Sequence, residues 1–264
     1  MGSNIRPYKR FAQHFLRDHF LARRIIDSLK IQSGDHVLEI GPGEGVLTEF
    51  LIKSPAERII AVEIDFRLAS ILRGKFKQHR QFELIEGDFL KSDLNSFVIG
   101  EKKLRVVGNL PYSITSPILF SLLDRRSIID DVIVTVQKEV GERITSPPGS
   151  KVYGIPSVFF QLFSQTEILF TIQRSAFYPK PKVDSAVLHI AFLPQPRYKI
   201  EDEVFFRKLL KTVFSQRRKM LRNSLKSMVK DEKVLKLIPI DLSQRPEELS
   251  IEEFVLLSNE LSNK

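Results

Sequence analysis

Short apolar runs rich in β-branched residues alternate with amphipathic segments through the first two thirds of the chain. Continuous apolar stretches, such as those in 58–63 and 131–136, are typical of strands covered on both faces. The pattern predicts seven strands, over 36–40, 58–63, 82–86, 104–108, 131–136, 167–172 and 184–192. Helical spacing lies between several of them, at 47–53, 67–77 and 116–123. Strands that alternate with helices predict an α/β fold with a mainly parallel sheet.

The last two predicted strands are joined only by a proline-rich loop over 177–182. A connection this short favours an antiparallel pair at one end of the sheet. Pro194 and Pro196 then interrupt the chain, because proline ends a strand and cannot continue a helix.

The pattern beyond these prolines is helical only. Apolar residues recur every three or four positions over 205–230, which predicts one long amphipathic helix. A second helix is predicted over 251–261, since Ser250 with Glu253 three positions later is a typical capping box. We therefore expect an α/β domain over 1–195 and a small all-helical domain over 196–264.

The composition excludes several kinds of chemistry. The 264 residues are 42% hydrophobic and 28% charged, as in soluble globular proteins. Because the chain has no cysteine, it can hold no disulfide, thiolate zinc site or iron–sulfur cluster, and it has no cysteine nucleophile. No metal site is predicted. The basic start of the chain does not resemble a signal peptide, and no apolar run is long enough to span a membrane. We expect a soluble cytoplasmic protein without a membrane partner.

Positive charge is concentrated in two segments. The net charge is +9, yet residues 1–30 carry +5 and residues 205–230 carry +9, so the other residues sum to −5. A weakly acidic body with two basic segments is typical of proteins that bind a polyanion such as a nucleic acid. The alternative is that these cations form a solvated face without a partner.

Glycines and acids follow three consecutive predicted strands. The strand 36–40 runs into Gly41-Pro42-Gly43-Glu44-Gly45, and Glu63 and Asp88 lie at the ends of the next two strands. An acid in the place of Glu63 can accept hydrogen bonds from ribose hydroxyls, and Asp88 can accept from an adenine amino group. The glycine loop alone could be a tight turn, and each acid alone is more often a solvated strand end. Together they predict an adenosyl ligand, and the absence of a Walker lysine pattern argues against ATP.

The fourth strand leads into Asn109-Leu110-Pro111-Tyr112. This stretch resembles the Asx-Pro-Pro-aromatic motif of S-adenosylmethionine-dependent methyltransferases that modify exocyclic amines, although Asn and Pro also favour a simple β-turn. An adenine N6 lone pair is delocalised and is a poor nucleophile. The Asn109 side-chain oxygen and the Leu110 carbonyl could hold both amino hydrogens and orient the nitrogen. Pro111 would fix the turn, and Tyr112 would stack on an extruded base.

The whole chain resembles the ribosomal RNA small-subunit adenine dimethyltransferase family, known for kasugamycin resistance. The resemblance rests on the segments 10–16, 39–48, 108–112, 136–140, 148–154, 177–187 and 214–225. It implies a class I methyltransferase fold, which is Rossmann-like with a seven-stranded mainly parallel sheet. It also implies a set of residues that contact S-adenosylmethionine: His14, Leu16, Gly41, Glu63, Asp88 and Asn109.

The resemblance further implies that Phe177 stacks on the target adenine opposite Tyr112; from the residues alone, Phe177 could equally be a core aromatic. The implied substrate is a pair of adjacent adenosines in the hairpin loop at the 3′ end of small-subunit rRNA, each converted to N6,N6-dimethyladenosine late in ribosome assembly. Two departures are visible. Ala12 stands where the family usually has glycine, and Ile155-Pro156 replaces a more usual pair with leucine.

The basic segments are the predicted contacts with the RNA. The residues expected to bind phosphates are Arg10, Arg217, Arg218, Lys219 and Arg222. Three other readings stay open: a large-subunit rRNA methyltransferase of the erythromycin-resistance type, a non-catalytic assembly or transcription factor on the same fold, and a small-molecule methyltransferase. Leu110 favours the small-subunit group, since the resistance type commonly has isoleucine there. A monomer is expected.

Overall fold

The structure is a computed structural model that describes residues 13–229 and 232–262, in two compact units. The first unit contains the described part of Met1–Gly141 together with Glu167–Phe192. The second contains Glu142–Thr166 and the described part of Leu193–Lys264. The chain enters the second unit for the last time at Leu193, close to the domain boundary expected at residue 195. The sequence analysis did not predict that Glu142–Thr166 belongs to the second unit. The hydrophobic pattern shows local elements, but it does not show that a segment packs with a distant part of the chain.

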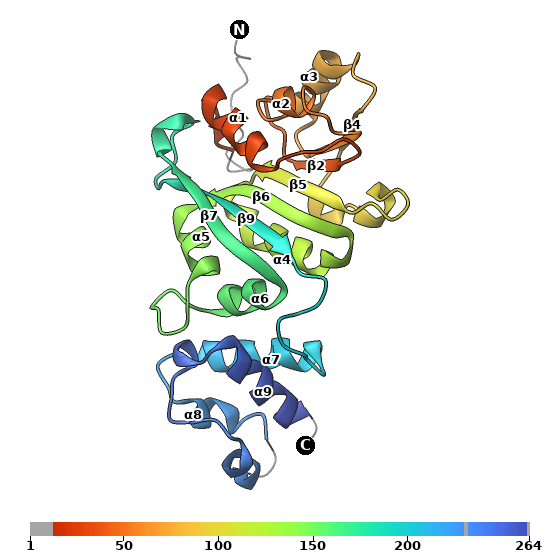
Figure 1. The fold of residues 1–264 in the computed structure, drawn as a ribbon. Helices are drawn as coiled ribbons and strands as arrows, with labels where there is room; N and C mark the ends of the chain where they lie inside the picture. Colours follow the sequence, from red (N-terminus) through yellow and green to blue (C-terminus); the bar gives the residue numbers. More distant parts are fainter. Residues whose placement is uncertain (1–12, 230–231, 263–264) are drawn as a thin grey trace. The chain divides into compact units, whose positions relative to one another are not determined.

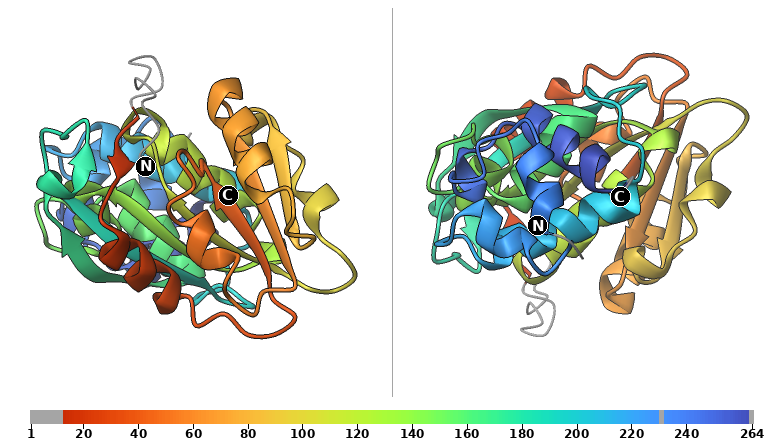
Figure 2. Two further views of the ribbon diagram at one scale, coloured as in Figure 1. Left: turned by 90° about the horizontal axis from the view of Figure 1, so that it is seen from above. Right: turned by 90° about the horizontal axis from the view of Figure 1, so that it is seen from below.

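The first unit is built on a seven-stranded sheet in the order β4-β3-β2-β5-β6-β9-β7 (Figure 1). Its strands are β2 (His36–Ile40), β3 (Arg58–Glu63), β4 (Phe82–Glu86), β5 (Leu104–Asn109), β6 (Ile129–Gln137), β7 (Ser164–Ile172) and β9 (Ser185–Phe192). The strands β2 to β6 pair in parallel, and β9 is antiparallel to β6. The ribbon colours therefore pass from orange at one end of the sheet to teal at the other (Figure 2). The predicted mainly parallel sheet is confirmed.

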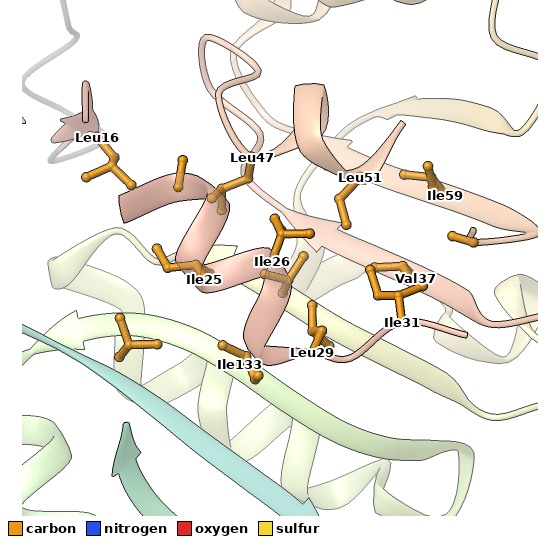
Figure 3. Packing of buried hydrophobic residues seen from close by; sticks show 14 of the residues in the cluster. Leu16, Ile25, Ile26, Leu29, Ile31, Val37, Leu47, Leu51, Ile59 and Ile133 are labelled. Atoms are coloured by element: carbon orange, nitrogen blue, oxygen red, sulfur yellow. The ribbon is translucent and has the colours of Figure 1, made fainter. Parts of the chain in front are cut away.

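The helices of the first unit are α1 (His19–Ser28), α2 (Thr48–Leu51), α3 (Phe66–Phe76) and α4 (Thr115–Asp124), with the start of α5 (Lys138–Thr145). The sequence analysis did not predict α1. It begins where the Asp18 carboxylate accepts a hydrogen bond from the Leu21 N–H at 3.0 Å. Its buried face, with Ile25 and Ile26, points toward the sheet (Figure 3). Burying such side chains stabilises the helix by about 1.5–3 kcal/mol each.

A second, two-stranded sheet joins distant parts of the first unit. Strand β1 (Phe15–Leu16) pairs antiparallel with β8 (Phe177–Tyr178), with Phe15 opposite Tyr178 and Leu16 opposite Phe177. This pairing holds the segment before α1 against the start of the proline-rich loop.

A charged cluster crosses strands β5, β6 and β9. The Arg105 guanidinium donates to both carboxylate oxygens of Asp131, at 2.8 and 2.7 Å, and to Asp35 at 2.9 Å. The His189 imidazole lies 3.4 Å from the same Asp131 carboxylate. Because Asp131 is largely buried, removing one of its partners would leave an unpaired charge and destabilise the sheet.

The second unit is helical, with α6 (Ile155–Phe163), α7 (Glu203–Ser215), α8 (Leu221–Leu225) and α9 (Ile251–Ser262). The predicted continuous helix over 205–230 is wrong, because the backbone leaves the helical region at Gln216 (φ −122°, ψ 41°). The N–H groups of Leu221 and Arg222 donate to the carbonyls of residues 244 and 242 instead of continuing the helix. These hydrogen bonds stabilise the break. The predicted capping box is confirmed: the Ser250 N–H donates to Glu253 at 2.8 Å, and the Glu253 N–H donates to the Ser250 hydroxyl at 3.2 Å.

Candidate active site

The glycine loop after β2 adopts a backbone conformation that suits glycine. Gly41, Gly43 and Gly45 all have positive φ, at +65°, +59° and +81°. A Cβ on Gly43 would also lie 3.1 Å from the Phe15 ring, so a side chain there would crowd that ring. The loop therefore brings bare backbone to the carboxyl edge of the parallel strands, where open α/β sheets bind ligands.

Glu63 at the end of β3 is a buried and fixed carboxylate. Its two oxygens accept hydrogen bonds from the Gly43 N–H at 3.0 Å and the Asp65 N–H at 2.8 Å, and the residue is only 3% exposed. Burial raises the pKa of Glu63, against the effect of these two N–H donors. Each carboxylate oxygen can accept a second hydrogen bond, so the side chain can receive two hydroxyl donors from a ligand.

These residues line a cavity with about 930 Å³ of empty space, part of it open to solvent. Its walls include all six residues predicted to bind the donor: His14, Leu16, Gly41, Glu63, Asp88 and Asn109. Asp88 accepts a hydrogen bond from the Leu90 N–H at 3.0 Å, which fixes its carboxylate. Ile64 and Phe89 add apolar surface beside the two acids. An adenosyl group, with a flat apolar base and polar edges, is compatible with such a lining.

Glu39 is a cavity residue that the sequence reasoning missed. It is 1% exposed, and its Oε2 accepts a hydrogen bond from the Thr48 hydroxyl at 2.6 Å, while its Oε1 has no partner among the described residues. Burial raises the pKa of Glu39 to about 8. An acid in the otherwise apolar strand 36–40, two residues before the glycine loop, was the available indication.

Asn109 is held by the segment before α1. Its Nδ2 donates to the His14 carbonyl oxygen at 2.7 Å. Only the amide nitrogen can donate to a carbonyl, so the orientation of the amide is fixed, and its oxygen is left without a partner among residues 13–229 and 232–262. Asn109 and Leu110 both line the cavity, and the Leu110 N–H donates to the Thr135 carbonyl at 3.1 Å.

Two aromatic rings adjoin Asn109. The His14 ring centroid lies 5.2 Å from that of Tyr112. The His14 Nδ1 is 2.6 Å from the Pro179 carbonyl oxygen, so this nitrogen carries the proton. The Tyr112 hydroxyl lies 2.6 Å from the Ser185 hydroxyl, and burial raises the pKa of Tyr112. The arrangement fixes a protonated phenol and an imidazole next to each other, with Asn109 bound to the backbone of the same histidine.

Residues 4–263 match the model of the family described as ribosomal RNA adenine dimethylase. The chain belongs to this family. As a ribosomal RNA adenine dimethylase, it is an enzyme that methylates ribosomal RNA adenines with S-adenosylmethionine as the methyl donor.

Similar proteins agree with this assignment. The chain is 41% identical over 265 residues to ribosomal RNA small subunit methyltransferase A of Geobacter metallireducens, covering 97% of this chain and 96% of that protein. It is 44% identical over 253 residues to the protein of the same name from Chlorobium phaeobacteroides, covering 96% and 93%.

Two solved structures have a similar fold. A dimethyladenosine transferase from Plasmodium falciparum superposes with a TM-score of 0.77 at 27% identity, over 92% of this chain and 96% of that one. The 23S rRNA methyltransferase ErmE superposes with a TM-score of 0.71 at 26% identity, over 94% and 99%. The predicted class I methyltransferase fold is confirmed.

The donor pocket of this dimethylase fits S-adenosylmethionine, because buried acids and apolar walls meet at a loop of exposed backbone. When bound, that molecule supplies an activated methyl group on a sulfonium. The described residues hold no group of three or more His, Asp or Glu side chains suited to a metal ion. Within the same residues, no helix is long and apolar enough to cross a membrane.

Two other sets of predicted site residues have different surroundings. Phe177 is 4% exposed and packs in the hydrophobic cluster that includes Leu16, so its expected stacking on the adenine stays a prediction. Arg10 lies outside the described residues. The other basic residues belong to the second unit, where Arg217 already donates to the Lys151 carbonyl at 3.1 Å and lies 3.8 Å from the Glu247 carboxylate. The remaining expected phosphate ligands are exposed: Arg218, Lys219 and Arg222.

Proposed function

We propose that this dimethylase transfers methyl groups from S-adenosylmethionine to N6 of two adjacent adenosines in the hairpin loop at the 3′ end of small-subunit (16S) rRNA, giving N6,N6-dimethyladenosines late in subunit assembly. The observation that carries the proposal is the fixed amide of Asn109, a residue that lines the donor cavity and whose side-chain oxygen has no partner within the described part of the chain. The small-subunit target is supported by relatives near 40% identity, whereas ErmE, a 23S enzyme, is 26% identical.

The Asn109-Leu110-Pro111-Tyr112 loop performs the positioning that the reaction needs. The Asn109 oxygen and the Leu110 carbonyl accept the two amino hydrogens, which orients the N6 lone pair toward the methyl group and stabilises the positive charge that develops on nitrogen. Tyr112 stacks on the adenine. No strong base is required, because the methylated amine becomes acidic and loses its proton readily to solvent.

The donor is held by residues of the first unit. Glu63 accepts hydrogen bonds from the ribose hydroxyls and Asp88 accepts one from the adenine amino group, while Gly41 allows close approach of the backbone. His14 and Leu16 close the cavity on the side of β1. Phe177 joins Tyr112 on the adenine only if its ring leaves the buried cluster.

The RNA backbone is bound by exposed cations. Arg218, Lys219 and Arg222 of the second unit contact phosphates, assisted by Arg10 and by Arg217 when it releases its present partners. The cationic excess in these segments supports this assignment. We further propose that the enzyme acts as a monomer in the cytoplasm, where ribosomes are assembled.

A labelling experiment tests the function. Immature small subunits and mature large subunits are each incubated with the enzyme and methyl-labelled S-adenosylmethionine, and the modified nucleotides are mapped. We expect label at two adjacent adenosines of the small-subunit hairpin loop, and none with the Asn109→Ala variant. Label in large-subunit RNA, or near-normal turnover by a folded Asn109→Ala variant, would refute the proposal.

A further inference from the structure

Tyr178 is an exposed aromatic residue in the small sheet beside the donor cavity. Its backbone pairs with Phe15, whereas that of Phe177 pairs with Leu16. Residues opposite each other in an antiparallel pair share a face, so Phe15 and Tyr178 lie on one face and Leu16 and Phe177 on the other. Phe15, Leu16 and Phe177 are all buried, at 7%, 4% and 4% exposed, whereas Tyr178 is 49% exposed. The ring of this loop that is open to a ligand is therefore Tyr178.

A cation already stacks on this ring. The guanidinium carbon of Arg17 lies 4.2 Å from the Tyr178 ring centroid. Residue 17 is two positions after Phe15, which puts it on the same face of the strand, and its N–H donates to the Ala176 carbonyl at 3.0 Å. Arg17 has no acidic partner within 13–229 and 232–262, so its charge is not neutralised by an ion pair. Arg17 and Tyr178 together form a cationic, planar surface, which we call the Arg17–Tyr178 pair.

The Arg17–Tyr178 pair adjoins the reaction loop. Pro179 follows Tyr178 directly, and its carbonyl oxygen lies 2.6 Å from the Nδ1 of His14. The His14 ring in turn lies 5.2 Å from the ring of Tyr112, centroid to centroid. An RNA chain whose target base reaches Tyr112 therefore passes close to the pair. Further exposed cations occur in the same loop at Arg174, Lys180 and Lys182.

We propose that the Arg17–Tyr178 pair is a stacking platform for the nucleobase next to the target adenine. Extruding one base from an RNA loop leaves its neighbour without a stacking partner, at a cost in free energy. An aromatic ring backed by a guanidinium replaces that lost stacking, and it accepts any base because every base has a π-face. The inference rests on the proposed function and adds a second RNA contact to it.

Steady-state kinetics on immature small subunits test the platform. Tyr178→Leu removes the ring, and we expect the KM for the small subunit to rise roughly 5- to 150-fold, as for the loss of one stacked base. The kcat, the donor Kd and the melting temperature stay at wild-type values. Tyr178→Phe keeps the ring and the wild-type KM. Arg17→Ala raises the KM, whereas the control Arg23→Ala, which removes an exposed arginine paired with Asp27 on α1, does not.

The outcomes separate the two proposals. If the wild-type enzyme does not label small-subunit RNA, the proposed function fails. If the wild type labels it and Tyr178→Leu has the same KM, the platform is refuted while the function stands. A rise in donor Kd or a fall in melting temperature for Tyr178→Leu would also refute the platform, because the ring would then be structural. An equal loss with Tyr178→Phe would assign the effect to the hydroxyl group and overturn stacking.

Discussion

The contact between Asn109 and His14 gives a sharp prediction for Asn109→Asp. In the wild type, the amide nitrogen donates to the His14 carbonyl at 2.7 Å, and the amide oxygen stays available. An ionised carboxylate keeps an acceptor for the substrate, but it has no proton to give to the carbonyl. Two oxygens then face each other across a hydrogen-bond distance, and the segment 13–16 that lines the donor cavity loses one of the contacts that hold it.

The magnitude follows from these contacts. The lost hydrogen bond and the unsatisfied carbonyl cost about 1–3 kcal/mol, so we expect the donor Kd to rise roughly 5- to 150-fold. For Asn109→Ala, the substrate amine also loses an acceptor, and we expect kcat to fall by about 10² to 10³ beyond that effect. The Asp variant therefore retains more kcat than the Ala variant while sharing its weaker donor binding.

The assay combines calorimetric titration of the donor with methyl transfer to immature small subunits at two pH values. Lowering the pH protonates a carboxyl, which can then donate to the His14 carbonyl, so we expect Asn109→Asp to recover donor affinity relative to the wild type. A wild-type donor Kd for Asn109→Asp at pH 8 would refute the positioning role of the His14 carbonyl. Melting temperatures within a few degrees of the wild type serve as the folding control.

Three further predictions concern charge. Burial raises the pKa of Glu39 from 4.5 to about 8, so the wild type loses stability as the pH rises from about 4.5 to about 8, and the loss is complete above that range. Glu39→Gln should therefore melt at a higher temperature than the wild type at pH 9, and equal melting would contradict this. The hydrogen bond with Asp131 raises the pKa of His189. The protonated imidazole therefore stabilises the folded protein below pH 6.5, and this contribution is lost as the pH rises through the raised pKa. In urea unfolding, His189→Gln should lower the free energy of unfolding more at pH 6 than at pH 9. RNA binding should weaken steeply as the salt concentration rises. Arg218→Ala should reduce the slope of the logarithm of the association constant against log[salt] by about 1. An unchanged slope would show that Arg218 does not contact a phosphate.

Much of the sheet could be predicted from the sequence, because β2 and β3 are buried on both faces and β4, a partly exposed edge strand, has a short run of strand-favouring residues. The bounds of β2, β3 and β4 agree with the predicted ranges 36–40, 58–63 and 82–86. A strand covered on both sides is mostly apolar, so the sequence indicates its limits. The strand-end acids were found for a related reason, since parallel strands bring their carboxyl ends to one edge.

The elements that failed depend on contacts between distant residues. Helix α1 is an exception: it has an amphipathic pattern and an Asp18 N-cap, so this element could have been predicted and was overlooked. The break after α7 is stabilised by hydrogen bonds to carbonyls of residues 242 and 244, which no local pattern reveals.

Part of the site could likewise be predicted from the sequence, and part could not. Residue types placed Glu63, Asp88 and Asn109 together, and all three line one cavity. The sequence could not show that β1 pairs with β8, and this pairing buries Phe177 and exposes Tyr178. Nor could it show that the His14 carbonyl fixes the Asn109 amide, because 95 residues separate the two.

The most direct measurement is a crystal structure of the enzyme with S-adenosylhomocysteine, the donor without its methyl group. The account predicts the ribose on Glu63, the adenine edge on Asp88, and the sulfur directed at the space beside the Asn109 side-chain oxygen that the substrate amine would occupy. A ligand bound outside this cavity, or an Asn109 oxygen turned away from the sulfur, would contradict it.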